Sequence, residues 1–218
     1  MDRIWEEIHS RNEWGAYPSE HVIRFFARNY YGRVRNGEQI KVLDFGCGGG
    51  AHTWYLAREG FCVYAFDGSE HAVRNTENRL KRENLQASFK VADGTDVQYE
   101  RDFFDAVLDN VCIYANRLED IRSMYHKIYG FLKPGGKLLT VCFGRNTCGF
   151  GQGTEIEENT FTDIKKGPLT ERGVNHFFDE ADIGKVISEA GFRNLRTDRI
   201  LYTDRGDQVE QFVTQAEK

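Results

Sequence analysis

A hydrophobic run that ends in a cluster of glycines constrains the fold of this chain more than any other feature. Residues 40–45 read Ile-Lys-Val-Leu-Asp-Phe, and Gly-Cys-Gly-Gly-Gly follows before a helix-like segment that begins at Ala51. The run predicts a buried strand, and the glycines predict a tight turn whose backbone a ligand can approach closely. A helix that begins at such a turn offers unpaired N–H groups and a positive potential. We therefore expect a ligand site at residues 46–51.

The middle of the chain alternates predicted strands and helices. After the strand at 40–45, further strands are expected at 61–66, 87–91, 103–109 and 137–143, and the segments between them have helical patterns at 51–59, 70–83 and 121–132. A helix at 179–190 and two strand candidates at 195–202 and 209–214 follow. Strands separated by helices predict a parallel sheet with right-handed crossovers.

Two segments lie outside this alternation. Residues 144–176 contain several glycines and an acidic stretch, and a connection of this length is usually functional or disordered. Residues 1–39 precede the first strand and carry a helical pattern. We expect residues 1–39 to form a helical cap and residues 40–218 to form one domain, with a variable segment at about 144–176 that covers the substrate.

Composition excludes several classes of protein. The 218 residues carry a net charge of −5, which disfavours a broad nucleic-acid surface. No apolar run approaches the ~20 residues of a membrane span, and the N-terminal residues lack a signal-peptide hydrophobic region. The five cysteines are odd in number without a Cys-x-x-Cys spacing, which favours reduced thiols over zinc or disulfides. We expect a cytoplasmic monomer or homodimer that binds no metal, membrane or nucleic acid.

Two kinds of nucleotide fit the glycine turn. Asp67 lies 21 residues after Gly46, at the end of the next predicted strand, where its carboxylate can accept hydrogen bonds from a ribose diol. Gly46, Gly48 and Ala51 also satisfy the pattern that binds dinucleotides. Asp44 and Asp93 favour a different cofactor, because Asp44 can orient the loop or meet a ligand ammonium group through water, and Asp93 ends the third strand, where an adenine amino group would be held. The start of the motif at residue 42, after a helical segment, also favours a cofactor other than a dinucleotide.

At this point the chain resembles the class I, seven-stranded Rossmann-like methyltransferases that depend on S-adenosylmethionine (SAM), of the small-molecule type. The resemblance covers residues 40–143 and more weakly 177–214, and its pieces are residues 42–50, 66–69, 91–94, 104–110 and 132–139. It implies an α/β fold with a doubly wound, mostly parallel seven-stranded sheet. It also implies an antiparallel last strand at 209–214, helices on both faces and an N-terminal helical appendage.

The resemblance also implies roles for individual residues, with S-adenosylhomocysteine (SAH) as the product. Gly46, Gly48 and Gly50 would approach the methionine part of SAM, Asp67 the ribose and Asp93 the adenine. The remaining expected cofactor residues are Asp44, Cys47, Gly68, Gly94 and Asn110. Trp14 and Tyr17 either form an aromatic lid with residues 144–176, since aromatic faces attract a sulfonium cation, or fasten the first helix to the core.

The acceptor site is less constrained by sequence. A hydroxyl acceptor requires a base, whereas a neutral amine requires only alignment. His176, between the variable segment and two phenylalanines, is the expected base unless it only packs, and Tyr114 is expected to line the acceptor pocket or simply to pack. We expect methyl transfer to an O or N atom of a small molecule, with a sugar or nucleotide-sugar as one acceptor class. The alternatives are an NAD(P)-dependent oxidoreductase and a non-catalytic SAM-binding protein.

Overall fold

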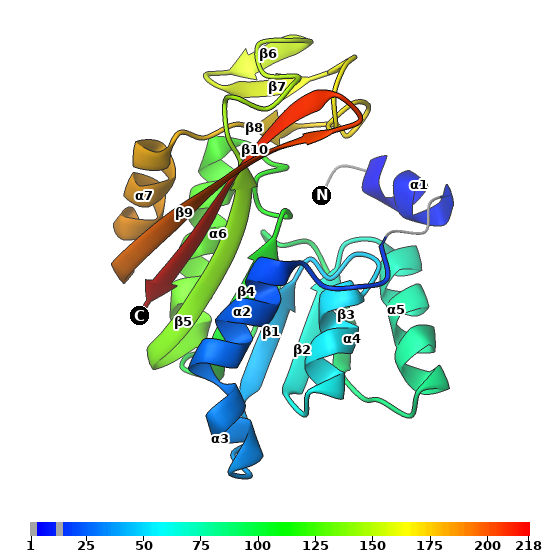
Figure 1. The fold of residues 1–218 in the computed structure, drawn as a ribbon, viewed down its shortest axis with the longest axis vertical. Helices are drawn as coiled ribbons and strands as arrows, with labels where there is room; N and C mark the ends of the chain where they lie inside the picture. The colour runs from blue at the N-terminus through cyan, green and yellow to red at the C-terminus, as the bar shows by residue number, and fades with distance from the viewer. Residues whose placement is uncertain (1–3, 12–14) are drawn as a thin grey trace.

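The computed structural model describes residues 4–11 and 15–218, and its centre is a twisted sheet of seven strands with helices on both faces (Figure 1). The strand order is β3-β2-β1-β4-β5-β10-β9. The strands span β1 Lys41–Phe45, β2 Cys62–Asp67, β3 Ser88–Val91, β4 Phe104–Asn110, β5 Leu132–Phe143, β9 Arg193–Asp204 and β10 Asp207–Glu217. The helices span α1 Ile4–Arg11, α2 Glu20–Asn29, α3 Tyr31–Arg35, α4 Ala51–Arg58, α5 Glu70–Arg82, α6 Leu118–Phe131 and α7 Glu180–Glu189.

The pairing directions confirm the expected fold class. Strands β1 to β5 pair in parallel, whereas β10 is antiparallel to both β5 and β9. The chain order reverses at β1, which has β2 on one side and β4 on the other. In open parallel sheets, ligands bind beyond the carboxyl ends of the strands at this point of reversal. The topology therefore places the glycine turn, which follows β1, at the expected ligand position.

Alternation along β1 divides the hydrophobic core into two layers. Val42 packs with α2 and α4 on one face, in a cluster that includes Phe26 and Leu56. Leu43 and Phe45 point to the other face and join the cluster that contains side chains of α6 and α7. A strand that is apolar on both faces needs helices on both sides, and this explains the doubly wound arrangement.

Helix α2 is part of this core. Its side chains Val22, Phe25 and Phe26 are buried in the same cluster as Val42. The boundary at residue 39 between a cap and a domain stays a prediction. Within the described parts of the chain, no helix is long and apolar enough to cross a bilayer.

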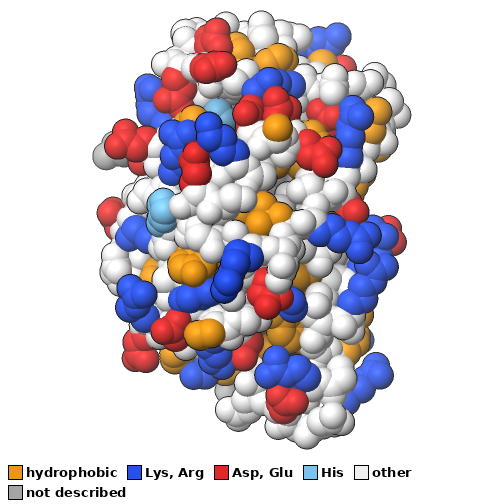
Figure 2. Space-filling model, turned by 90° about the vertical axis from the view of Figure 1, so that its left-hand side faces the viewer, with side chains coloured by type: hydrophobic (Ala, Val, Ile, Leu, Met, Phe, Trp, Pro, Cys, Tyr) orange, Lys and Arg blue, Asp and Glu red, His pale blue; other side chains and the backbone are white. Residues whose placement is uncertain are grey.

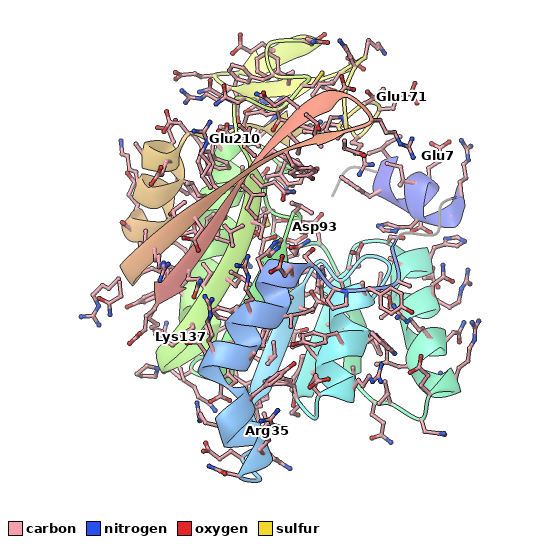
Figure 3. The ribbon with its side chains drawn as sticks, in the orientation of Figure 1. Glu7, Arg35, Asp93, Lys137, Glu171 and Glu210 are labelled. Carbon is pink, nitrogen blue, oxygen red and sulfur yellow. The ribbon has the colours of Figure 1, made fainter. Side chains whose placement is uncertain are left out.

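The segment between β5 and α7 contains a second sheet, which the sequence did not predict. Its antiparallel strands are β6 Thr154–Glu157, β7 Thr160–Thr162 and β8 Asn175–His176, at the top of Figure 1. The segment is fastened to β10 by the buried Glu210, whose carboxylate accepts a hydrogen bond from the Asn146 N–H at 2.9 Å (Figure 3). The Thr147 hydroxyl donates to the Glu210 carbonyl at 2.9 Å. Residues 144–176 are therefore an ordered roof over the end of the sheet.

The surface shows no large area of one charge sign on the face seen in Figure 2, where cationic and anionic side chains are interspersed. All five cysteines are free thiols, and Cys47 and Cys142 are buried. The described residues contain no group of three or more His, Cys, Asp or Glu side chains arranged to hold a metal ion.

Candidate cofactor and acceptor site

A cavity of about 340 Å³ lies at the carboxyl ends of β1, β2 and β4. One part of its wall is the turn after β1, residues 46–51, and another is formed by the residues that follow β2 and β3. The loop after β4 and Arg172, from the segment above the sheet, also line it, as do residues of α1 and of the segment before α2. The expected cofactor residues that line it are Gly46, Cys47, Gly48, Gly50, Asp67, Gly68, Asp93, Gly94, Asn110 and Tyr17.

The glycines of the turn are constrained in different ways. Gly46, Gly48 and Gly50 have φ angles of 76°, 49° and 76°, a region that glycine occupies without steric cost. A side chain at Gly46 would overlap Cys112, and one at Gly50 would overlap Thr76. Above Gly48, the nearest atom to an added Cβ is in the His9 ring, 3.4 Å away. Packing within the protein thus requires Gly46 and Gly50, whereas Gly48 borders the cavity and the ring of His9.

Asp67 joins the end of β2 to the glycine turn. Its Oδ2 accepts a hydrogen bond from the Gly48 N–H and its Oδ1 accepts one from the Ser69 N–H, both at 2.9 Å. The residue is 7% exposed and lines the cavity. Each carboxylate oxygen accepts more than one hydrogen bond, so Asp67 retains capacity for two hydroxyl donors of a ligand.

The region after β3 forms a second wall. Asp93 accepts hydrogen bonds at Oδ1 from the N–H and the hydroxyl of Thr95, at 2.9 and 2.8 Å. At Gly94, an added Cβ would lie 2.8 Å from Met124 Sδ and 3.0 Å from the Phe45 ring. The absence of a side chain at Gly94 therefore lets Met124 approach and line the cavity beside it.

Asp44 lies where it can orient the loop, which is one of its two expected roles, and not where it would meet a ligand. It is 1% exposed and does not belong to the residues that line the cavity. Its Oδ2 accepts a hydrogen bond from the Thr53 hydroxyl at 2.5 Å, and burial raises the pKa of Asp44 to about 7. The side chain connects β1 with the first turn of α4, and so it supports the glycine turn from below without facing a ligand.

Asn110 lines the cavity at the end of β4, and its Oδ1 lies 2.8 Å from His21 Nε2. A second histidine contact joins the same regions, because the Ser19 N–H donates to His52 Nε2 at 3.4 Å. Burial lowers the pKa of His52 to about 4. The two contacts connect the start of α2 with the loops that follow β1 and β4.

Asp109 shapes the loop after β4, a role that the sequence analysis missed. This fully buried carboxylate accepts hydrogen bonds from the N–H groups of Cys112 and Ile113, at 3.0 and 3.1 Å. It also accepts one from the Thr140 hydroxyl at 2.6 Å. Burial raises the pKa of Asp109 to about 6. These bonds fold residues 110–115 so that Cys112 and Tyr114 line the cavity.

Of the two expected catalytic residues, Tyr114 lines the cavity and His176 does not. Tyr114 lines the cavity, with its ring centroid 4.9 Å from that of Phe143, and burial raises the pKa of its phenol well above the usual value. His176 is buried and lies outside the described wall of the cavity. Its Nδ1 lies 2.6 Å from the Thr160 hydroxyl, and burial lowers its pKa to about 4. The geometry gives His176 a packing position beside the site.

Helix α1, within the expected N-terminal cap, borders the cavity through two residues that the sequence did not single out. Its side chains Trp5 and His9 line the cavity, although α1 contains no buried residue. Glu6 accepts hydrogen bonds from Ser69 and His71 at the start of α5, and these bonds lower the pKa of Glu6 to about 2.

Of the two aromatic residues expected to form a lid, the structure describes only Tyr17. Tyr17 is 78% exposed at the rim of the cavity, with its ring 5.9 Å from that of Trp54. Trp14 lies outside the described residues.

Comparisons with known proteins agree with this architecture. A family model described as "Methyltransferase domain" matches residues 42–136. An uncharacterized methyltransferase of Synechocystis is 33% identical over 172 residues, which cover 78% of this chain and 74% of that protein. Among solved structures, a SAM-dependent methyltransferase from Methanosarcina mazei has a TM-score of 0.71 at 24% identity, covering 85% of this chain and 96% of that one. Phosphoethanolamine N-methyltransferase 1 of Triticum aestivum is 30% identical over 74% of this chain.

The fold and the cavity thus define a doubly wound α/β protein with a ligand cavity at the carboxyl ends of its parallel strands. The chain belongs to the class I SAM-dependent methyltransferases. It spans 30% of the length of the wheat relative, and 39% and 44% of two further phosphoethanolamine N-methyltransferases. Membership of this family decides between the two nucleotide cofactors that the glycine turn left open.

SAM is the cofactor of this family, and the residues present fit it. The Gly48 backbone borders the cavity, Asp67 keeps acceptor capacity for a diol, and Gly94 and Met124 both line the wall after β3. His9 lies above Gly48, so α1 packs directly over the part of the turn that the methionine group of SAM would approach.

Proposed function

We propose that this chain transfers a methyl group from SAM to an N or O atom of a small molecule. One observation carries the proposal: the same cavity is lined by Gly48 and Asp67 and also by Tyr114 and Phe143. A cofactor held by the first pair and an acceptor held against the second would therefore share one enclosed space. Residues 144–176 cover that space, and a covered site keeps water from the reacting atoms.

The chain's own residues contribute position and hydrogen bonds to such a reaction. When bound, SAM supplies an electrophilic methyl group on a positively charged sulfur. Asp67 and the glycine turn hold the nucleoside and amino-acid parts. The raised pKa of Tyr114 keeps its phenol protonated, so Tyr114 orients an acceptor by donating a hydrogen bond and does not act as a base. Asp109 fixes the loop that carries Tyr114.

Nitrogen and oxygen are both candidates for the acceptor atom. The matched relatives include phosphoethanolamine N-methyltransferases and a ubiquinone biosynthesis O-methyltransferase of Coxiella burnetii. These names support small organic acceptors of both kinds. A sugar or nucleotide-sugar acceptor stays a prediction, as do the cytoplasmic location and the monomeric or homodimeric state.

Calorimetry with SAM and SAH tests the cofactor assignment, and we expect both to bind at micromolar concentrations. A metabolite screen that detects SAH release, with mass spectrometry of the methylated product, then tests catalysis. Binding of neither compound at high micromolar concentration contradicts the proposal. Cofactor binding without transfer to any acceptor favours a non-catalytic SAM-binding protein, whereas fluorescence titration with NADH or NADPH tests the oxidoreductase alternative.

A further inference from the structure

We propose that Arg172 binds an anionic group of the ligands in the cavity, either the carboxylate of the methionine part of the cofactor or an acidic group on the methyl acceptor. The inference rests on the proposed function and assigns a role to a residue of the 144–176 segment. It also predicts that the charge of this side chain, and not only its size, is needed for ligand binding.

The position of Arg172 is the first observation. The residue lies just before β8 in the roof segment, is half-buried and lines the cavity. Among the described residues of the cavity wall, it is the only lysine or arginine. Figure 3 shows its neighbour Glu171 on the loop that extends toward α1. The roof therefore brings one guanidinium group to a cavity whose other described lining residues come from α1, the segment before α2, the first turn of α4, α6, and the ends of the strands with the loops that follow them.

The charges around Arg172 are the second observation. Arg172 lines the same cavity as Tyr114 and His9, and its positive charge lowers the pKa of both groups. The histidines in the wall do not duplicate this charge, because burial lowers the pKa of both His9 and His52. A guanidinium group binds carboxylate and phosphate groups with two parallel hydrogen bonds. Arg172 is thus the group in the described wall that is chemically suited to an anion.

The hydrogen-bond donors near Arg172 are the third observation. The Tyr114 phenol stays protonated and so can donate to the same anion. The carboxylates that line the cavity already accept backbone hydrogen bonds, Asp67 from the Gly48 and Ser69 N–H groups and Asp93 from the Thr95 N–H. The arrangement therefore separates an acidic, nucleoside-binding region from a cationic region under the roof.

The first arm of the test separates the cofactor's carboxylate from the rest of the nucleoside. Calorimetry compares SAH with 5′-methylthioadenosine, which lacks the amino-acid group, in the wild type, Arg172→Gln, Arg172→Lys and the control Glu171→Gln. If the carboxylate is the partner, Arg172→Gln weakens SAH binding by about tenfold or more and leaves 5′-methylthioadenosine unchanged. Arg172→Lys then restores part of the affinity, and Glu171→Gln behaves like the wild type.

The second arm tests an acidic group on the acceptor. Inorganic phosphate is titrated into the SAH-bound protein, and if the acceptor is the source, phosphate binds in the wild type and not in Arg172→Gln, while SAH affinity stays within twofold. The proposal is overturned if SAH affinity is unchanged and phosphate binding is absent or unaffected. An equal loss of SAH and 5′-methylthioadenosine also overturns it, because Arg172 would then act on the fold of the roof. Failure of the wild type to bind SAH would instead contradict the proposed function.

Discussion

The backbone N–H of His176 donates a hydrogen bond to the carbonyl oxygen of Tyr114 at 2.9 Å. This bond joins β8 of the roof to the loop after β4, which Asp109 folds from the opposite side. The position of Tyr114 in the cavity therefore depends on two separate parts of the chain. His176, which the sequence predicts as the base for the acceptor, thus holds the loop that carries Tyr114.

Replacing Asp67 tests the nucleoside contact. Asp67→Ala removes an ionised acceptor that we expect to bind the ribose diol, and hydrogen bonds to charged groups contribute about 1.5–3 kcal/mol each. We therefore expect SAH affinity, measured by calorimetry, to fall by at least about tenfold. Asp204→Ala, an exposed aspartate on β9, is the matched control and keeps the wild-type affinity. Unchanged SAH affinity in Asp67→Ala would show that the ribose lies elsewhere.

The two glycines of the turn should respond differently to a methyl group. Both Gly46→Ala and Gly48→Ala place a side chain at positive φ, which costs about 1–2 kcal/mol. Gly46→Ala in addition overlaps Cys112, and overpacking typically costs a further ~1–3 kcal/mol. Urea unfolding should therefore give a lower free energy of unfolding for Gly46→Ala than for Gly48→Ala. Equal losses in the two variants would contradict the packing of Cys112 against the turn.

The buried imidazole of His176 predicts a pH dependence of stability. Burial lowers the pKa of His176 from 6.5 to about 4, so between these values the unfolded chain binds a proton that the folded chain does not. Stability is therefore lost as the pH falls from about 6.5 to about 4, by an amount on the order of 3 kcal/mol at most. His176→Gln should reduce this loss in denaturant unfolding measured across the pH range.

The exposed His126 provides the control for this measurement. His126→Gln should leave the slope of stability against pH as it is in the wild type. Asp44 and Asp109, whose pKa values are raised, act in the opposite direction over the same range, so the difference between variant and wild type is the quantity to compare. A slope that His176→Gln does not change would be evidence against a buried neutral imidazole.

Glu6 should control how fast the cofactor leaves. Its carboxylate joins α1 to Ser69 and His71, and the described residues of α1 include none that is fully buried, although Trp5 packs partly against the core. In Glu6→Gln we expect the dissociation rate of SAH, followed by stopped-flow fluorescence, to rise several-fold. Glu7→Gln is the control, because Glu7 pairs with Arg11 within the same exposed helix. Similar rates in both variants would mean that Glu6 does not hold α1 in place.

Much of the sheet could be predicted from local patterns. Strands β1, β2, β4 and β5 contain mostly apolar runs next to a glycine or an aspartate, and an apolar run bounded by turn residues is typical of a buried strand. The start of β5 was missed, because Pro134, Gly135 and Gly136 indicate a turn, yet the structure pairs Leu132 with Phe104 before them. The roof strands β6 to β8 were missed because they are only two to four residues long and depend on contacts with one another.

The candidate site likewise contains some residues that local sequence patterns predict and others that only tertiary contacts bring to the cavity. Gly48, Asp67 and Asp93 could be placed together because each follows a parallel strand, and the carboxyl ends of such strands meet. His9 and Arg172 come from a separate helix and from the roof, so no local spacing connects them with the cavity. His176 was chosen for its chemistry and its neighbours in sequence, whereas tertiary packing turns its ring toward Thr160.

The packing of Cys112 against Gly46 ties two loops that would otherwise be free to diverge. In the proposed function, the turn at 46 borders the cofactor, while the loop at 112 borders the region proposed for the acceptor. A larger residue at 112 would push on the turn at 46, so acceptor preference in this scaffold can be retuned through Tyr114, Phe143 and the roof far more readily than through position 112.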